Sequence, residues 1–560
     1  MSDRRIVECV PNFSVGRDRV GVEAIAQAVR GVAGVSLLDV DPGVDTNRTV
    51  YTFVGEPEPV LAAALAAARA AWNVIDMTAH SGAHPRMGAL DVCPFVPVSG
   101  ISMEECVKLS RSFGEALSKE LGVPVFLYEY AATRPGRRNL ADIRSGEYEA
   151  LPEKMGKPEW EPDYGPARFI PRWGATVTGA REFLIAYNVN LNTRDKKLAN
   201  EVAMTVREGG RAAKDPQGST MKDAAGNTIK VPGLLRDVRA IGWYIDSYRQ
   251  AQVSINLVNY RTTPLHVVFE TVKTEAERRG MLVTGSEIVG MVPLGPLTDA
   301  GRHFLARTGK SEGASQLELV EIAVRSMGLD SVADFDPSKK IVEWACQGPK
   351  PLAGMKVSAF VDEISNESPA PGGGSVAALA GSLGAALAAM VGNLTVGKKG
   401  YESDWKGLSA MAAKAQAVKE RLLDAVDEDS SAYNGILEAS RMPKSTDAEK
   451  AARDAALEAA NKRAAEVPLA TARACVEAAR LCVEAADKGN SNSVSDAGVG
   501  ALMARTGAIG ASLNVLINLA GIRDLAFNAR VGAEASSLMA EAQDIEEVVI
   551  ARVRAIIGMS

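Results

Sequence analysis

Histidine, cysteine and aromatic residues are scarce in this chain of 560 residues. It contains four histidines and six cysteines, and Phe, Trp and Tyr together make up 5% of it. The cysteines are scattered without a C-x-x-C pair, which excludes a zinc framework of that type and indicates a reducing compartment. The N-terminus lacks a long apolar core that ends in a cleavage site. We therefore expect no secretory signal and a cytoplasmic protein.

Other absences narrow the class of protein further. The formal net charge is -6, so bulk charge gives no reason to expect a nucleic-acid or anionic-membrane partner. No G-x-G-x-x-G follows a predicted strand and no Walker loop is present, so a nucleotide-binding fold has no support. One nearly all-apolar run, Val376–Met390, is shorter than the ~20 residues of a membrane span. Small residues interrupt this run and suit close helix packing, so we expect a soluble bundle helix rather than a span.

The first 181 residues alternate between strand and helix patterns. Runs rich in β-branched residues are separated by stretches with apolar residues at helical spacing, which is typical of an α/β layer structure. We predict strands at 6–10, 35–39, 49–54, 91–96 and 123–128, and helices near 22–32, 58–75 and 103–121. Between Arg134 and Gly174 the chain is rich in proline, glycine and aromatic residues, which favours an ordered loop that covers a ligand over a disordered one.

Two further regions of different composition follow in the sequence. Residues 182–340 read as a second α/β unit, with strands at 183–189, 240–245 and 252–258, helices near 196–208 and 264–279, and an exposed polar insert at 212–226. Residues 341–354 are predicted to be a linker. Residues 355–560 are alanine-rich with apolar residues at helical spacing, which predicts an all-α bundle with helices near 405–441, 447–486, 499–520 and 524–557.

Two of the four histidines lie in the short segment His80–Phe95. Gly82, Pro85 and Gly88 interrupt any helix there, so the segment is predicted to be a loop. The run Leu90–Val96 then reads as a buried strand that holds this loop. Histidine is the side chain best able to exchange a proton near neutral pH, and loops held by strands commonly carry reactive groups.

His80 and His84 leave three interpretations open. Their spacing of four residues would suit a zinc site on a helix, but the intervening glycine and the following proline disfavour that helix. Both histidines can instead be structural. In a catalytic interpretation Asp91 or Asp39 orients a histidine, and Arg86 binds a carboxylate of the substrate. The charged residues beside the histidines favour the catalytic interpretation.

A glycine-rich loop, Ala370–Ser375, directly precedes the apolar run. Three glycines at a helix start expose backbone N–H groups, and the helix dipole adds partial positive charge, so an anion or a polar ring can bind there. The other interpretation is a flexible cap in which Ser375 is the helix N-cap. The spacing leaves both interpretations open.

An acidic run, Asp424–Asp429, lies on a predicted helix. Such a run is usually a solvated helix face. Asp429 lies one turn before Tyr433, and Val426 lies on the same side, so this carboxyl group can also be buried with a raised pKa suited to proton transfer. Both interpretations stay open at this point.

Together with these features, the chain resembles the bifunctional formiminotransferase–cyclodeaminases of histidine breakdown and folate metabolism, over nearly its whole length. The resemblance is carried in the N-terminal part by segments 7–14, 38–41, 47–55, 84–97, 173–175 and 178–181, and in the helical part by 371–376 and 514–519.

The resemblance implies roles for particular residues. The family's transferase histidine falls on His84, and its cyclodeaminase aspartate falls on Asp429, two residues after Asp427. Its folate-binding loop falls on Gly165, Pro166, Ala167, Arg168, Phe169, Ile170, Pro171, Arg172, Trp173 and Gly174. In this loop the rings of Phe169 and Trp173 can stack on a pterin. We also expect substrate or folate contacts from Asp39, Arg86, Gly372, Gly373, Gly374 and Ser375.

The implied chemistry consists of two reactions on one carrier. The first transfers a formimino group from N-formimino-L-glutamate to N5 of tetrahydrofolate and releases L-glutamate. The second closes 5-formiminotetrahydrofolate to 5,10-methenyltetrahydrofolate and releases ammonia. Tetrahydrofolate, in polyglutamylated form, is the shared co-substrate, and no metal is expected.

The resemblance also implies an architecture. It consists of two α/β subdomains with facing sheets and outer helices, a separate helical deaminase domain, and a ring-shaped homo-oligomer of dimers. Two rival functions stay open: a single-activity transferase whose helical half only assembles the oligomer, and a scaffold protein with vestigial sites. The presence of Asp429 and the glycine loop disfavours the first rival, and intact His84 and Arg86 disfavour the second.

Overall fold

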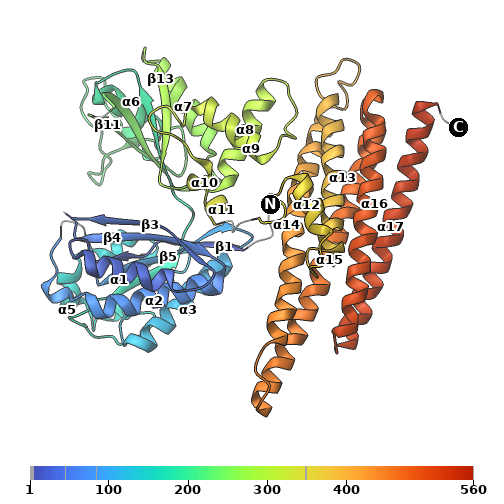
Figure 1. Cartoon of the computed structure of the whole chain (residues 1–560). Helices are drawn as coiled ribbons and strands as arrows, with labels where there is room; N and C mark the ends of the chain where they lie inside the picture. Colours follow the sequence, from blue (N-terminus) through green and yellow to red (C-terminus); the bar gives the residue numbers. More distant parts are fainter. Residues whose placement is uncertain (1–4, 45, 83–84, 247, 347–349, 559–560) are drawn as a thin grey trace. The chain divides into compact units, whose positions relative to one another are not determined.

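The computed structural model describes residues 5–44, 46–82, 85–246, 248–346 and 350–558. The chain forms two compact units. Among the described residues, one unit contains 5–297 together with Val324–Cys346, and the other contains Thr298–Ala323 together with the C-terminal helices. The first unit holds the β-sheets and the second is helical, so the predicted order of α/β units followed by an all-α region is confirmed (Figure 1).

The first sheet is mixed and, within the described residues, has the strand order β1-β4-β2-β5-β7-β6, with β3 paired to β4. Strands β5, β7 and β6 are parallel and the other pairs are antiparallel. The strands are β1 Ile6–Cys9, β2 Asn12–Phe13, β3 Val35–Gly43, β4 Arg48–Gly55, β5 Leu90–Ser99, β6 Val125–Glu129 and β7 Thr176–Ala180. The burial of β5 on both of its faces follows from its central place in this sheet.

Helices α1 (Arg19–Arg30), α2 (Pro57–Val74) and α3 (Met103–Leu121) pack on one face of this sheet and bury a core of aliphatic and aromatic side chains with it (Figure 1). Local signals set the ends of α3. Ser102 and Glu105 form a capping box at its start, and Gly122 ends it in the left-handed conformation at φ 67°.

The segment between β6 and β7 covers part of the other face of the sheet. It contains short helices: η2 Pro135–Arg137, α4 Leu140–Arg144, η3 Tyr148–Ala150, α5 Leu151–Lys154 and η4 Pro158–Trp160. Its apolar side chains pack on sheet residues such as Val92, Phe126 and Val177. The prediction of an ordered segment is therefore confirmed, and its aromatic residues are explained by packing on the sheet.

The second sheet is antiparallel with the order β11-β12-β8-β13. Its strands are β8 Ile185–Leu191, β11 Val238–Ile245, β12 Gln250–Leu257 and β13 Val283–Val289, and it packs against α6 (Lys196–Val206) and α7 (Leu265–Glu277). The insert after α6 forms the two-stranded sheet of β9 (Arg211–Ala212) and β10 (Lys230–Val231), and its turn residues are exposed as predicted.

The remaining helices up to residue 345 are α8 Leu294–Arg307, α9 Gln316–Met327, α10 Pro337–Lys340 and α11 Val342–Ala345. Residues at the start of the predicted linker 341–354 belong to ordered elements, because Ile341 and Val342 are fully buried and Ile341 pairs with Val292. The positions of the domain boundaries stay a prediction.

The helical region consists of α12 Val357–Ile364, α13 Gly373–Thr395, α14 Trp405–Ser440, α15 Asp447–Lys488, η5 Ser491–Ser493, α16 Val494–Asn518, η6 Leu519–Gly521 and α17 Leu525–Ile557. Small residues let these helices approach closely. A Cβ atom at Gly381 would lie 2.3 Å from Cys475 Sγ, and one at Gly507 would lie 2.7 Å from the Ala377 carbonyl oxygen. The alanine- and glycine-rich composition is therefore a packing requirement of the bundle.

Two stretches are long and apolar enough to span a membrane by length and composition, α13 and Ser491–Gly521. Within their most apolar windows, 67% of the residues of α13 and 44% of those of Ser491–Gly521 are buried. Most of α13 is thus accounted for as a core helix of the bundle, in line with the expectation for the run Val376–Met390.

Candidate functional sites

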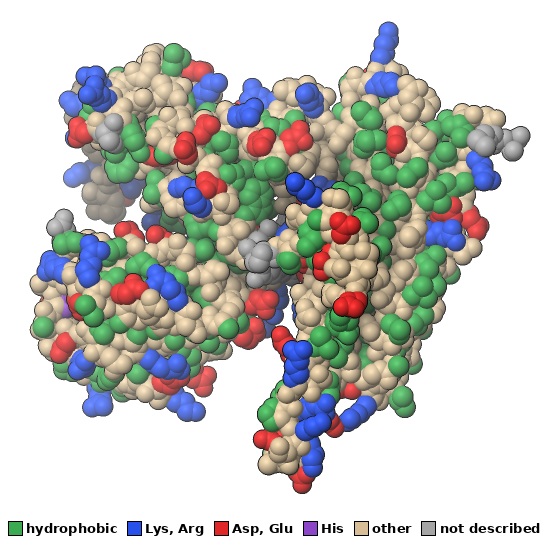
Figure 2. All heavy atoms as spheres, viewed as in Figure 1, with side chains coloured by type: hydrophobic (Ala, Val, Ile, Leu, Met, Phe, Trp, Pro, Cys, Tyr) green, Lys and Arg blue, Asp and Glu red, His purple; other side chains and the backbone are tan. Residues whose placement is uncertain are grey.

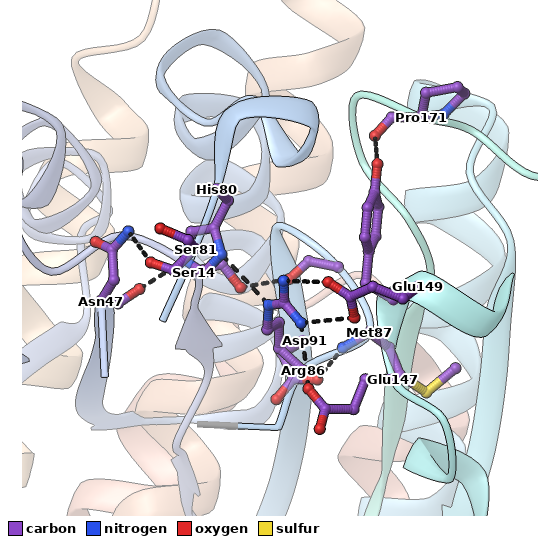
Figure 3. Close-up of polar contacts among 12 residues, drawn as sticks. Ser14, Asn47, His80, Ser81, Arg86, Met87, Asp91, Glu147, Glu149 and Pro171 are labelled. Atoms are coloured by element: carbon purple, nitrogen blue, oxygen red, sulfur yellow. Dashed lines mark hydrogen bonds and ion pairs between the residues drawn. The ribbon is translucent and has the colours of Figure 1, made fainter. Parts of the chain in front are cut away.

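The histidine predicted to act in the transferase, His84, lies outside the described residues. The flanking segments are described, and they show how the loop is held. Both ends of the loop are tied to the first sheet and to the segment that follows β6 (Figure 3).

His80 has a structural role within the described part of the loop. Its Nε2 lies 2.9 Å from the Asn47 carbonyl oxygen, and its Nδ1 accepts a hydrogen bond of 3.3 Å from Arg86 Nε. A carbonyl oxygen needs a donor and a guanidinium is only a donor, so the ring is neutral with its proton on Nε2. Burial lowers the pKa of His80, with Arg86 and Arg17 adding to the effect. Of the interpretations open for this histidine, the structural one fits.

Arg86 is buried, with 7% of its surface exposed, and its guanidinium lies between His80 and two glutamates (Figure 3). Its Nη atoms donate to Glu149 at 2.7 and 2.9 Å and to Glu147 at 3.1 Å. Four of its hydrogen bonds are thus made within the protein. In this structure the guanidinium of Arg86 is paired with carboxylates of the protein, and the expectation that it binds a substrate carboxylate stays a prediction.

Asp91, at the start of β5, is fully buried and holds the loop in place. It accepts hydrogen bonds from Arg144 Nη2 at 2.5 Å and from the Met87 backbone N–H at 2.9 Å, and it lies 3.6 Å from Arg48 Nη2. Its partners in the described residues are therefore two arginines and the loop backbone. Asp39, the other aspartate expected to orient a histidine, is exposed on β3 opposite Thr52.

The predicted folate-binding loop, Gly165–Gly174, lies directly against the histidine loop. The Ala89 N–H donates to the Trp173 carbonyl oxygen at 2.8 Å, and the Ala175 N–H donates to the Met87 carbonyl oxygen at 3.0 Å. Gly174 has a φ of 78°, and a Cβ atom there would lie 2.1 Å from the Met87 carbonyl oxygen. The structure therefore brings together two segments that lie some eighty residues apart in the sequence.

The two aromatic rings of this loop differ in exposure. Trp173 is 0% exposed; its ring packs 5.7 Å from that of Trp72, and its Nε1 donates to Thr176 at 2.9 Å. The ring of Trp173 therefore belongs to the core in this structure, and its stacking on a pterin stays a prediction. Phe169 is half-buried beside Tyr148, with ring centroids 5.3 Å apart. The side chains of Arg168, Pro171 and Arg172 are exposed.

A cavity of about 530 Å³ lies next to the histidine loop. It is lined by Pro85, residues 139–141 and 144–147, and Arg239 of β11. Pro85 directly follows His84 in the sequence, and Arg144 and Arg239 contribute positive charge to the wall. Glu147 also lines the wall, and Arg144 is paired with Asp91. Arg239 is therefore the lining cation that makes no ion pair within the described residues, and a cavity of this size can hold a small molecule.

In the helical unit the structure brings Asp429 onto the glycine loop. The carboxylate of Asp429, on α14, lies directly against Gly374. A Cβ atom at Gly374 would lie 2.0 Å from Asp429 Oδ1, so a larger residue would clash there. The Ser375 hydroxyl lies 3.5 Å from Asp429 Oδ2 and donates to the Val426 carbonyl oxygen at 2.8 Å. Burial raises the pKa of Asp429, and hydrogen bonds from Ser375 partly offset that rise. The interpretation of Asp429 as a partly buried acid is therefore supported.

The N-terminus of α13 does not have the N-cap residue that one of the two interpretations predicted. The N-cap is Gly372 rather than Ser375, whose side chain is fully buried against α14. The glycines at 373 and 374 leave room for neighbouring side chains. Asn514 Nδ2 lies 3.3 Å from the position of a Cβ at Gly373, so α16 also contributes a polar group to this site.

Asp427 has a different role from Asp429. Its two oxygens accept the backbone N–H groups of Leu352 at 2.9 Å and Ala353 at 3.1 Å. It therefore holds the chain that leads into α12, while Asp429 faces the glycine loop. The structure therefore distinguishes the roles of these two aspartates. The sequence pattern alone did not distinguish them.

Sequence reasoning missed Glu147, Glu149, Arg144 and Asn514. The first three lie in the segment after β6, where the composition indicated only an ordered loop. Asn514 lies in a family segment but carried no separate signal. Each of these four residues contacts a residue that is far away in the sequence, so only the folded structure identifies it.

Three family models match consecutive parts of the chain. Residues 6–181 match the formiminotransferase domain, N-terminal subdomain; residues 186–347 match the formiminotransferase domain; and residues 356–537 match the family described as formiminotransferase-cyclodeaminase. The chain is 45% identical to the formimidoyltransferase-cyclodeaminase of Gallus gallus over 553 residues, which cover 98% of each chain. The chain belongs to the formimidoyltransferase-cyclodeaminase family.

Shorter relatives match each half of this family member separately. A glutamate formimidoyltransferase of Streptococcus pyogenes is 40% identical over 301 residues, covering 54% of this chain and 93% of its own. A methenyltetrahydrofolate cyclohydrolase of Methylorubrum extorquens is 40% identical over 191 residues, covering 34% of this chain and 92% of its own.

We predict that Arg86→Lys lowers the free energy of unfolding by about 1.5–3 kcal/mol, because an ammonium cannot reproduce the fork between Glu149, Glu147 and His80. Urea unfolding followed by circular dichroism measures this change. Arg168→Lys, at an exposed position, serves as the matched control and should stay within about 0.5 kcal/mol of the wild type. Equal stability of the two variants would show that the Arg86 network adds nothing.

Proposed function

We propose that this chain catalyses both reactions named for its full-length relatives. It transfers the formimino group of N-formimino-L-glutamate to N5 of tetrahydrofolate, and then closes 5-formiminotetrahydrofolate to 5,10-methenyltetrahydrofolate with release of ammonia. The observation that carries the proposal is the match over 98% of both chains, which spans both the α/β part and the helical part. Tetrahydrofolate, polyglutamylated, is the shared co-substrate, and the reactions belong to histidine breakdown.

The transfer step is assigned to residues 1–340. N5 of tetrahydrofolate attacks the formimino carbon and loses a proton, and the departing nitrogen of glutamate gains one. His84 exchanges these protons, since histidine titrates near neutral pH and the neighbouring His80 is held neutral by Asn47 and Arg86. Arg239, which is exposed and lines the cavity beside Pro85, supplies positive charge for a carboxylate of the amino-acid donor.

The ring-closing step is assigned to residues 355–560. N10 attacks the formimino carbon and loses its proton, and the formimino nitrogen leaves as ammonia. Asp429 exchanges these protons, because its burial raises its pKa towards the range where a carboxyl group can both accept and donate. Gly373 and Gly374 let Asn514 and this carboxylate approach the start of α13, where we expect the folate to bind.

A coupled assay tests the two activities together. Purified protein is incubated with N-formimino-L-glutamate and tetrahydrofolate, and methenyltetrahydrofolate absorbance and ammonia are followed. Formation of both products supports the proposal. Transfer without release of ammonia would support the rival function of a single-activity transferase. The absence of any reaction would support the rival function of a scaffold protein.

We predict that His84→Ala lowers the rate of formimino transfer by about 10²–10⁴-fold, the usual contribution of a general acid–base group. Ammonia release from supplied 5-formiminotetrahydrofolate should be unchanged. His80→Ala provides a comparison within the same loop, and it should act through stability rather than through proton exchange. Transfer at the wild-type rate in His84→Ala would refute the assignment.

We predict that Asp429→Asn keeps the transfer reaction but causes 5-formiminotetrahydrofolate to accumulate, because the amide keeps the shape and cannot exchange the proton. Asp427→Asn is the matched control two residues away. It should lower stability by weakening the contacts with Leu352 and Ala353 while ammonia release continues. The reverse pattern would show that Asp427 is the catalytic aspartate.

We further propose a homo-oligomer, a ring of dimers, located in the cytoplasm. All six cysteines are free thiols, which supports a reducing compartment. Exposed apolar side chains form a stripe along α13, at Val376, Leu383 and Leu394, and another along α16, at Leu502 and Leu513. Hydrophobic side chains gather on the long helices in the space-filling view (Figure 2). Such a contiguous apolar surface is typical of a subunit interface.

We predict that Leu383→Glu shifts the protein to a smaller species, because a buried unpaired carboxylate disfavours association. Light scattering coupled to gel filtration measures the mass. Leu198→Glu, at an exposed leucine of α6, is the control and should leave the mass unchanged. A wild-type monomer, or an unchanged mass in Leu383→Glu, would contradict the proposed interface.

A further inference from the structure

The second sheet has one apolar face and one polar face. Tyr187, Val189, Val253 and Ile255 are buried on the face covered by α6 and α7. The intervening residues lie on the opposite face. They form a row of polar side chains, which we name the polar face: Asn188, Asn190, Gln252, Ser254, Asn256 and Glu287, with Arg239 and Trp243 of β11.

The polar face contains one connected hydrogen-bond network centred on Glu287. Its Oε1 accepts from Asn188 Nδ2 and from Gln252 Nε2, both at 3.0 Å, and its Oε2 accepts from the Tyr248 hydroxyl at 3.2 Å. Gln252 also donates to Asn190 Oδ1 at 2.6 Å and accepts from Trp243 Nε1 at 2.8 Å. The carboxylate is therefore fixed by neutral donors, with no cationic side chain bonded to it in the described residues.

The network leaves acceptor positions unused on Glu287 and Asn188. An ionised carboxylate has about four acceptor positions, and the three bonds to Glu287 occupy three of them. The remaining position is on Oε2, and the side-chain oxygen of Asn188 takes no hydrogen bond within the described residues. Two neighbouring acceptors, one of them charged, match a planar unit that presents two N–H donors.

This face is open to a ligand. Glu287 is half-buried and Trp243 is 38% exposed, so a planar group can reach the carboxylate beside an indole ring. Arg239 lies on the same face of the sheet, opposite Asn256, and it also lines the cavity beside Pro85. Arg239 thus belongs both to the polar face and to the wall of the cavity beside Pro85.

We propose that Glu287 and Asn188 bind a planar N–C–N donor unit of a transferase substrate. This inference rests on the proposed function, whose substrates contain two such units. One is the formimino group of N-formimino-L-glutamate, an amidine that is protonated and cationic at neutral pH. The other is the 2-amino-4-oxopyrimidine edge of the tetrahydrofolate pterin. Both present parallel N–H donors to a carboxylate.

Isothermal titration calorimetry on the full-length protein tests this inference without depending on turnover. The dissociation constants of N-formimino-L-glutamate and of tetrahydrofolate are measured for the wild type and for Glu287→Gln. We expect the dissociation constant of one ligand to rise about 10-fold or more, because a charge-assisted pair is lost. The affected ligand identifies which donor unit binds. Unchanged constants for both ligands would overturn the inference.

Two controls make the result decisive. Glu277→Gln, at an exposed glutamate of α7 outside the polar face, should leave both constants unchanged. If Glu287→Gln does not fold, Tyr248→Phe removes one donor to Glu287 and should change the constant of a single ligand by about 2–5-fold. No change in that folded variant would also overturn the inference. A wild type that binds both ligands without transferring the formimino group would refute the proposed function and not this contact.

Discussion

The buried carboxylate of Asp91 is the interaction on which the transferase site depends. It lies at the start of the central strand β5 and joins Arg144, Arg48 and the Met87 backbone. A fully buried carboxylate is stable only when its partners are complete, so the histidine loop and the segment after β6 are held in one arrangement. Arg86 extends the same arrangement to Glu147, Glu149 and His80. Asp91 and Arg86, which were expected beside the reacting histidine, are therefore paired with groups of the protein itself.

The candidate site in the helical unit also depends on one carboxylate, that of Asp429, and here the constraint is close packing of the backbone. Asp429 can lie against the loop before α13 only because Gly374 has no side chain. The small residues of α13 and α16 bring the helices close enough for Ser375 to be fully buried against α14. Close packing thus supplies the partial burial that raises the pKa of Asp429. In both units, the candidate chemistry is set by what surrounds one carboxylate.

Much of the fold could be predicted because its signals are local. Helix α3 begins and ends where its capping box and terminal glycine indicate, and the bundle helices follow the apolar spacing closely. Strands β7 and β13 were missed. Thr176–Ala180 and Val283–Val289 are short and contain glycine, so their strand character comes from pairing with β5, β6 and β8.

The sequence by itself determined the order of α/β units and helical bundle, because hydrophobic periodicity is a local signal, and its resemblance to a known family indicated both reactions. The sequence did not determine which charged side chains are available for the reaction and which hold other parts of the protein in place. Asp427 and Asp429 differ only in their partners across the fold, and so do Arg86 and Arg239. Trp173 was expected at a ligand and lies in the core. Only the tertiary structure decides such cases, because burial and pairing depend on residues far apart in the chain.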